Sequence, residues 1–161
     1  MNIYLIVLLV LFILYIYCYF VFSSVITILQ TNVNDFKFDL LYQKQPIVIN
    51  DKIKNINNIL DIWFKQNIID NNINIDNNSW ITNKYKYLYI YTLYDTEILL
   101  SKPNINNKIP DEKEKIINIK LKEFQSLIIP FKWKYFIDNK NNINLYGIHD
   151  YITYFLAFFL F

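Results

Sequence analysis

Hydrophobic and polar positions divide the chain sharply, and the first division is an uninterrupted apolar run. Residues 3–22 are all Ile, Leu, Val, Phe, Tyr or Cys, and the first charged side chain is Asp35. Twenty helical residues extend about 30 Å, which matches the hydrocarbon thickness of a bilayer. We therefore predict a single transmembrane anchor over residues 1–30, with lipid-facing positions that include Ile3, Leu9, Phe12, Tyr15, Phe20 and Phe22.

The flanks of this run favour an uncleaved anchor over a secretory signal peptide. A signal peptide has a basic segment before a shorter apolar run and a cleavage site of small residues. Here no basic residue precedes the run, and only Ser23 and Ser24 are small near its end. Lys37 and Lys44 follow the run, and positively charged flanks tend to stay on the cytoplasmic side of a membrane. They weakly favour a cytoplasmic domain but do not determine the topology.

After a predicted polar linker over residues 31–39, a strand and a helix are expected. Pro46 opens the apolar run 47–49, which is typical of an edge strand because proline lacks the N–H that a sheet needs. Asn50 or Asp51 is then the expected cap of one amphipathic helix. Its apolar stripe has helical spacing and consists of Ile53, Ile56, Leu60, Trp63 and Phe64. We interpret Trp63 as a core anchor.

The middle of the chain changes to the period of two that strands show. Residues 67–83 form an expected loop with a short strand at 73–75, and alternation begins at residue 85. Tyr87, Tyr89 and Tyr91 share one strand face, which suggests either cross-strand packing, a protein interface or, less favoured, ligand stacking. We name these three, together with Trp133, as candidate partner-interface residues.

Later segments predict more strands, and together they define the fold class. Apolar or alternating runs occur at 98–100, 117–121 and 127–129, and residues 131–137 are expected to form a hairpin with 143–148. We predict an α+β, mostly β, domain over residues 40–161: a small β-sandwich or barrel with one amphipathic helix.

Residues 151–161 are a second apolar run, but eleven helical residues extend only about 16 Å. That length is too short to span a bilayer. The run is expected to contact a partner or the membrane surface in preference to forming an internal strand. Phe155 and Phe158 are its candidate interface residues.

Composition excludes several classes of function. The chain has 16 Lys, no Arg and 14 acidic residues, so its net charge of +2 gives no basic face of the kind that binds nucleic acid. A single glycine excludes a glycine-rich phosphate loop. The single cysteine, Cys18, can form no disulfide within the chain and is interpreted as a small hydrophobic residue.

No residue pattern predicts an active site, a metal or a cofactor. The only histidine, His149, follows Gly147-Ile148 and is interpreted as a turn residue with local hydrogen bonds. Asp111, Glu112 and Glu114 alternate with lysines, which is typical of a solvated turn and not of a cation site. We therefore expect a protein that is not an enzyme.

Two stretches resemble the cupin-like (JmjC-type) family. In residues 40–64, Gln45-Pro46-Ile47-Val48-Ile49 precedes a helix ending in Trp63; residues 119–135 resemble that family's strand, turn and strand ending in Pro130-Phe131-Lys132-Trp133. The resemblance implies a cupin-like β-domain. The family's iron site needs two histidines and a carboxylate, whereas this chain has one histidine, so the resemblance implies a fold without oxygenase chemistry.

The general style of the chain is similar to membrane proteins of large DNA viruses, which is an analogy of architecture. It suggests a single-pass structural protein of the virion, such as a minor capsid component that links an internal membrane to the shell, or a protein of a host membrane. Its expected partners are the membrane and neighbouring proteins, without nucleic acid. Two alternatives stay open: an accessory subunit of an organellar membrane complex, and a membrane-tethered cupin-like enzyme or ligand binder.

Overall fold

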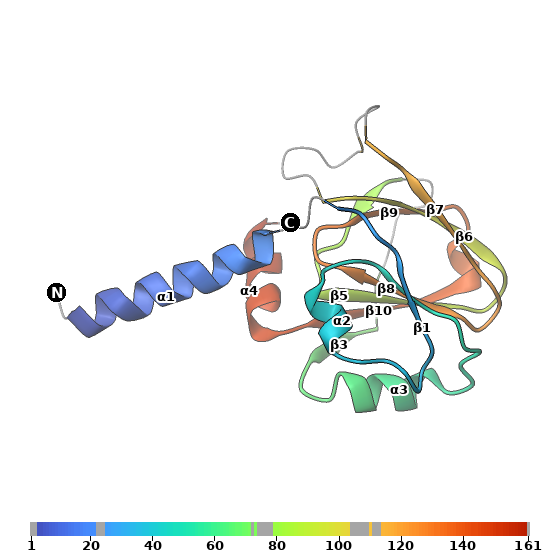
Figure 1. Cartoon of the computed structure of the whole chain (residues 1–161), viewed down its shortest axis with the longest axis horizontal. Helices are drawn as coiled ribbons and strands as arrows, with labels where there is room; N and C mark the ends of the chain where they lie inside the picture. Colours follow the sequence, from blue (N-terminus) through green and yellow to red (C-terminus); the bar gives the residue numbers. More distant parts are fainter. Residues whose placement is uncertain are drawn as a thin grey trace.

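The N-terminal helix stands apart from a body made of strands (Figure 1). The computed structural model describes residues 3–21, 25–71, 73, 79–103, 110 and 114–160. Helix α1 (Ile3–Phe20) corresponds to the first apolar run, and it projects away from the body instead of packing along it. The apolar run therefore forms a helix as predicted, but the helix ends at Phe20 and does not continue to residue 30.

The larger of two sheets has six strands in the order β1-β2-β8-β5-β10-β3. Neighbouring strands are antiparallel except for the parallel pair β1 and β2. The strands are β1 (Leu29–Thr31), β2 (Ile47–Ile49), β3 (Ile68–Asp70), β5 (Tyr87–Thr92), β8 (Ser126–Pro130) and β10 (Ile143–His149).

The smaller sheet has four antiparallel strands in the order β4-β9-β6-β7. They are β4 (Ile81–Thr82), β6 (Thr96–Ser101), β7 (Ile117–Leu121) and β9 (Lys134–Ile137). The remaining elements are α2 (Asp39–Tyr42), α3 (Ile56–Trp63), the short 3-10 helix η1 (Lys140–Asn142) and α4 (Tyr151–Leu160).

Two hydrophobic clusters hold these layers together. The first fills the space between the sheets and contains Leu88 and Ile90 of β5 opposite Ile98 of β6 and Ile137 of β9. The second lies on the other face of the six-stranded sheet, where Leu60 of α3 and Phe64 meet the tyrosines of β5. The central strand β5 is thus covered on both faces. A small α+β domain, mostly strands in two sheets, is confirmed.

Strand pairing differs from the prediction in two places. Strand β2 forms where expected, but it lies between β1 and β8 and is not an edge strand. Residues 131–137 and 143–148 do not form a hairpin, because β9 joins the small sheet and β10 joins the large one. Alternation along a strand shows which residues share a face. It does not show which strand will pair with it.

Several boundaries also differ from the prediction. The cap of α3 is Asn55, whose side chain accepts from the Asn58 N–H at 3.3 Å, whereas the Asp51 carboxylate accepts from Val33 N at 2.6 Å. Strand β1 uses residues assigned to the anchor and linker. Strands β3 and β4 form within the expected loop 67–83; Ile75 of the strand predicted at 73–75 lies outside the described residues.

Candidate functional site

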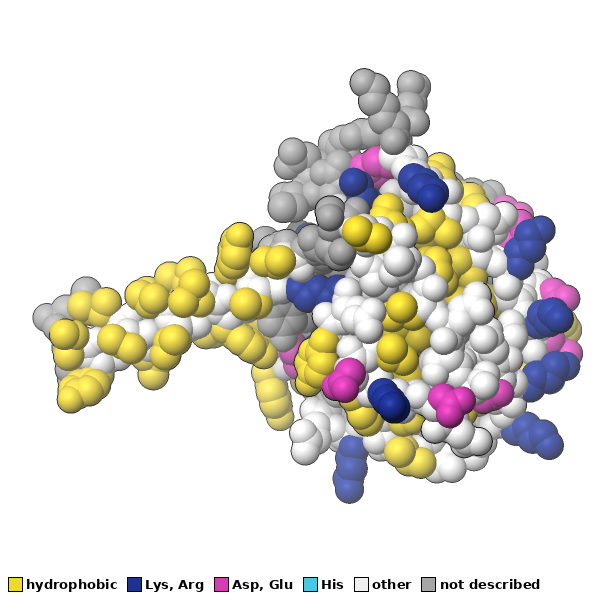
Figure 2. Space-filling view, viewed as in Figure 1, with side chains coloured by type: hydrophobic (Ala, Val, Ile, Leu, Met, Phe, Trp, Pro, Cys, Tyr) yellow, Lys and Arg dark blue, Asp and Glu magenta, His cyan; other side chains and the backbone are white. Residues whose placement is uncertain are grey.

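The side chains of α1 form the largest exposed apolar surface among the described residues. Ile16 is half-buried, and the exposed large side chains range from 39% at Ile6 to 79% at Tyr4; hydrophobic side chains follow the helix along its length (Figure 2). The predicted anchor positions Ile3, Leu9, Phe12 and Tyr15 are all exposed on it. A helix that is hydrophobic all round needs an apolar medium or partner around it.

Within the part of the chain that the structure describes, no helix is both long enough and apolar enough to cross a membrane. Phe20 lies in α1, but its side chain is outside the described set, as is the whole of Phe22.

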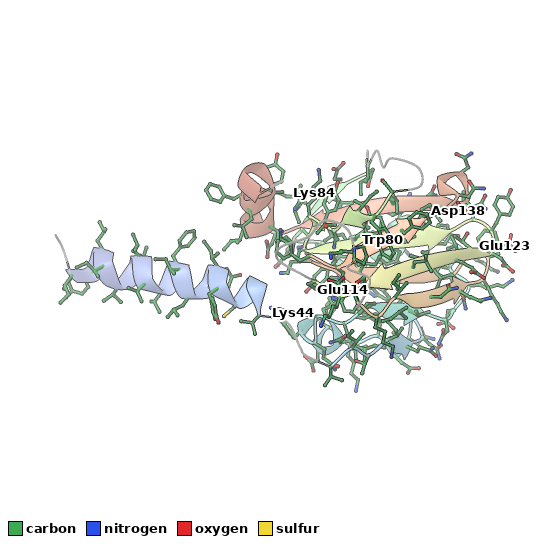
Figure 3. All side chains as sticks on the ribbon, turned by 90° about the horizontal axis from the view of Figure 1, so that it is seen from above. Lys44, Trp80, Lys84, Glu114, Glu123 and Asp138 are labelled. Carbon is green, nitrogen blue, oxygen red and sulfur yellow. The ribbon has the colours of Figure 1, made fainter. Side chains whose placement is uncertain are left out.

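Helix α4 adds a second apolar surface at the same end of the body, next to the end of α1 (Figures 1 and 3). Tyr154 and Phe155 are exposed, while Thr153 and Leu156 are buried against the domain. Asp150 caps the helix: its carboxylate accepts from Thr153 N at 2.8 Å, and Thr153 Oγ1 accepts from Asp150 N at 3.0 Å. The residues predicted as an apolar contact segment therefore form a helix attached by one face. The side chain of Phe158 lies outside the described set.

Lys44 joins α1 to the body (Figure 3). Its ammonium group donates to the carbonyl oxygen of Cys18 and, at 2.8 Å, to that of Val21. These carbonyls belong to the end of α1, where a helix lacks internal donors and favours a positive charge. The Lys44 carbonyl in turn accepts from Trp133 Nε1 at 3.1 Å. One residue thus connects the end of α1 to the core of the domain.

Gln45 secures the chain that follows α1. Its side-chain oxygen accepts from Thr27 N at 3.2 Å, and its side-chain nitrogen donates to the Val25 carbonyl at 3.0 Å. The side chain of Gln45 is buried, so these bonds satisfy polar groups that would otherwise lack water. Sequence reasoning missed both Lys44 and Gln45, because nothing in the local pattern shows that they meet residues about twenty positions earlier.

The candidate interface residues of the β domain lie inside it. Tyr87, Tyr89, Tyr91 and Trp133 are all buried, with Tyr89 at 0% exposure and Trp133 at 2%. The hydroxyl group of Tyr91 donates to the Ile53 carbonyl at 2.8 Å, and the ring of Tyr87 lies 6.1 Å from that of Phe64. The expectation of an exposed row is corrected: the segment around α3 covers this face, and only Phe155 of the named residues with a described side chain is exposed.

His149 lies in β10 and not in a turn, which corrects its predicted place. Its ring lies 4.7 Å from the ring of Tyr85 and 5.5 Å from that of Tyr154. Burial lowers the pKa of the imidazole, against smaller opposing effects of nearby Asp70 and Asp150. The single glycine, Gly147, gives Tyr85 its space, because a Cβ there would lie 2.3 Å from the tyrosine ring.

Glu114 and Lys134 form a buried pair beside the small sheet. Glu114 is not a solvated turn residue: it is 7% exposed and pairs at 3.3 Å with the fully buried ammonium of Lys134, while Ser101 Oγ donates to it at 2.8 Å. Asp111 and Glu112 lie outside the described residues. Among the side chains that are described, no group of three or more His, Cys, Asp or Glu could hold a metal ion.

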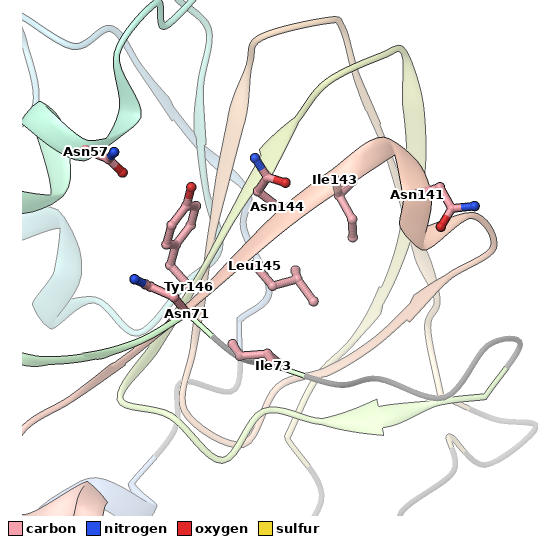
Figure 4. A pocket seen from close by; sticks show the side chains of 8 residues that line it. All are labelled: Asn57, Asn71, Ile73, Asn141, Ile143, Asn144, Leu145 and Tyr146. Atoms are coloured by element: carbon pink, nitrogen blue, oxygen red, sulfur yellow. The ribbon is translucent and has the colours of Figure 1, made fainter.

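An open hollow of about 540 Å³ lies beside β10 (Figure 4). Asn144 and Tyr146 project from one side of the strand and Ile143 and Leu145 from the other; Asn57, Asn71, Ile73 and Asn141 complete the lining. None of these eight side chains is a carboxylate, ammonium, imidazole or thiol. The hollow offers neutral hydrogen-bonding groups and no strong general acid or base.

No protein-family model, curated protein or solved structure matches this chain.

Proposed function

We propose that this protein is a membrane-anchored structural protein that is not an enzyme, and that it holds a rigid β domain at a bilayer surface. The observation that carries the proposal is α1, an uncharged helix whose described apolar side chains are exposed except for the half-buried Ile16. In water this surface would promote aggregation, whereas a bilayer satisfies it. The uncharged sequence continues past the helix as far as Asn34, and the crossing of the whole bilayer is part of the proposal.

The junction between α1 and the body supports a mechanical role. Lys44 and Gln45 bond to the end of α1 and to the chain behind it, and Trp133 ties Lys44 to the core. An anchor fixed in this way transmits orientation as well as attachment. An anchor on a flexible linker would transmit attachment alone.

The polar groups of the body also support a structural role. His149 is packed between two tyrosine rings, and the buried pair of Lys134 and Glu114 lies in the small sheet and the loop beside it. Neither group lines the hollow beside β10, the cavity between α1 and the body, or the hollow beside Asp95 and Asp138. Each is used in packing, so we assign no reaction to the domain.

Flotation of the full chain with phosphatidylcholine vesicles tests the anchor. The wild type is expected to float with the vesicles and to resist alkaline carbonate. In the variant Leu9→Lys/Phe12→Lys, two charges enter the centre of α1, each costing about 2.5–3.5 kcal/mol in a membrane-embedded helix, so flotation should be lost. The control Tyr94→Lys adds a charge at an exposed position of the body and should float normally.

Equal flotation of the wild type and the double lysine variant would overturn the anchor.

The predicted role in a virion requires a protein neighbour as well. Crosslinking through exposed lysines such as Lys52, Lys65 and Lys120 in the native membrane or particle would identify that neighbour. Links confined to the chain itself would contradict a role as a connector.

A further inference from the structure

The hollow beside β10 follows a stretch of strand edge that β3 does not reach. Strand β10 pairs with β5 along residues 143–148, whereas β3 pairs with its other side only along residues 147–149. Among the described residues, no strand pairs with residues 143–146 on that other side. Four strand residues extend about 13 Å. The hollow of about 540 Å³ lies along this edge, with Asn71 near one end and Asn141 near the other (Figure 4).

The register of β10 on β5 shows which backbone groups face the hollow. Leu93 N donates to the Asn142 carbonyl at 2.7 Å, so the backbone of Asn142 faces β5. In an antiparallel pair, successive residues direct their N–H and C=O groups alternately toward the partner strand and away from it. The even-numbered residues of β10 therefore face β5, whereas Ile143 and Leu145 each direct an N–H and a C=O to the opposite side.

The side chains around this edge form two faces of different character. The amides of Asn57 and Asn144 and the phenol of Tyr146 line the face toward α3 (Figure 4). On the other face, Leu145 and Ile73 are half-buried and pack against the hydrophobic cluster between the sheets. None of the described side chains that line the hollow carries a charge.

An extended peptide has groups that match both the backbone and the side chains of this edge. Its own N–H and C=O groups can continue the ladder of a sheet, and its side chains point alternately to the two faces. A charged side chain would lose water here and meet no opposite charge on the described lining. The edge therefore favours an uncharged segment in which apolar residues alternate with neutral polar ones.

We propose that the edge of β10 binds an uncharged extended segment of a neighbouring protein, which adds as a strand beside residues 143–146. Apolar side chains of that segment contact Leu145 and Ile73, and the alternate side chains, amides or hydroxyls, contact Asn57 and Tyr146. The inference goes beyond the proposed anchor and does not depend on it. It gives the body a site for the protein neighbour that a connector requires.

Amide hydrogen exchange of the full chain in nonionic detergent tests whether the edge is open. The N–H of Leu145 should exchange at least about tenfold faster than the N–H of Tyr146, because the first points into the hollow and the second belongs to the ladder with β5. Equal protection of the two amides in the free chain would show that another segment of the chain already covers the edge. That result would overturn the proposal.

Binding is measured with a library of acetylated and amidated hexapeptides in which Ile, Val or Leu alternates with Asn, Gln or Thr. The tightest member is then N-methylated at one or the other of its two alternating sets of residues. Methylation of the set whose N–H groups bond to β10 should weaken binding at least about tenfold, and methylation of the other set should have little effect. Strand addition would be excluded if no peptide bound or if the two methylated forms bound equally.

A matched pair of variants on α3 tests the place of binding. Asn57→Trp puts a large ring into the hollow and should weaken binding of the tightest peptide about fivefold or more. Asn58→Trp changes the next position of the same helix, which is exposed and does not line the hollow, and should bind as the wild type does. Equal affinity of the two variants would contradict the assignment of the hollow.

Discussion

Helix α1 and strand β5 are both dominated by apolar residues, yet their surroundings are opposite. The described side chains of α1 are exposed at nearly every position, whereas all six residues of β5 are buried. The difference lies in what covers them. The small sheet lies on one face of β5 and α3 on the other, while α1 touches the body only near its end. Hydrophobicity alone therefore does not place a segment inside the domain.

The comparison separates a body that covers its own apolar side chains from a helix whose apolar side chains the body leaves exposed. In the body, burial extends to charged groups such as Lys134, which is fully buried. In α1, even the largest side chains lack cover along most of the helix. Substitutions should therefore act on stability in the body and on lipid attachment in α1.

The largest effect on the body is expected from Lys134→Ala. The change removes one partner of the buried ion pair with Glu114, and breaking a buried pair in this way costs about 3–5 kcal/mol. The free energy of unfolding in urea measures the loss. The double variant Lys134→Met/Glu114→Gln removes both charges and keeps an acceptor for the Ser101 hydroxyl. It should therefore recover at least half of the lost free energy of unfolding. A Lys134→Ala protein of wild-type stability would contradict the buried pair.

A matched pair of truncations compares the two regions directly. Ile90→Ala opens a cavity in the core between the sheets and should lower the free energy of unfolding by about 2–5 kcal/mol. Leu8→Ala removes a similar volume from an exposed position of α1 and should change domain unfolding in detergent by less than about 0.5 kcal/mol. Similar losses in both variants would show that α1 packs on the domain.

Local pattern predicted the elements of both regions better than their environment. The apolar run at 3–22 gave α1, and alternation near residue 85 gave β5, since each period follows from backbone geometry. The burial of Tyr89 depends on α3 and residues near it, which arrive from a segment about thirty positions earlier. No local signal shows that this face is covered.

Long-range polar contacts escaped sequence reasoning for the same reason. Asn83 is one residue of an Asn-rich chain, yet its side chain donates to the carbonyls of Ile129 and Pro130 and accepts from Tyr85 N. Lys44 likewise gives no local sign of its bond to the end of α1. An excess of asparagine in the chain conceals the few that are structural.

A smaller effect is expected at the junction between the regions. Lys44→Met keeps the side-chain stem and removes the ammonium from the end of α1, which should destabilise the last turn by about 1 kcal/mol. Hydrogen exchange of amides near Cys18 should then become about fivefold faster, while unfolding of the body changes little. Lys37→Met, at an exposed position, is the control. Unchanged exchange would show that Lys44 does not hold the helix end.

The smallest expected effect is a dependence of body stability on pH through His149. Burial lowers the pKa of the folded imidazole below its ordinary value of 6.5, so the unfolded chain binds the proton more readily. The stability contributed by the neutral ring is complete above about pH 6.5 and is lost as the pH falls below it. His149→Gln should flatten the decline of the melting temperature between about pH 6.5 and 5, above the usual range of carboxylates. Asp70, Lys84 and Asp150 lie near the imidazole and also act on its pKa. If the melting temperatures of wild type and variant fell in parallel as the pH was lowered, His149 would not be the cause of the decline.

The central claim, that α1 lies in lipid while the body lies in water, is tested most directly by spin-label accessibility in phosphatidylcholine vesicles. Labels at Val10 of α1 and at Tyr94 of the body, each in a Cys18→Ser background, occupy exposed positions of the two regions. We predict that the Val10 label collides readily with oxygen and poorly with a water-soluble nickel chelate, and that the Tyr94 label shows the reverse. Ready access of the nickel chelate to both labels would contradict the account.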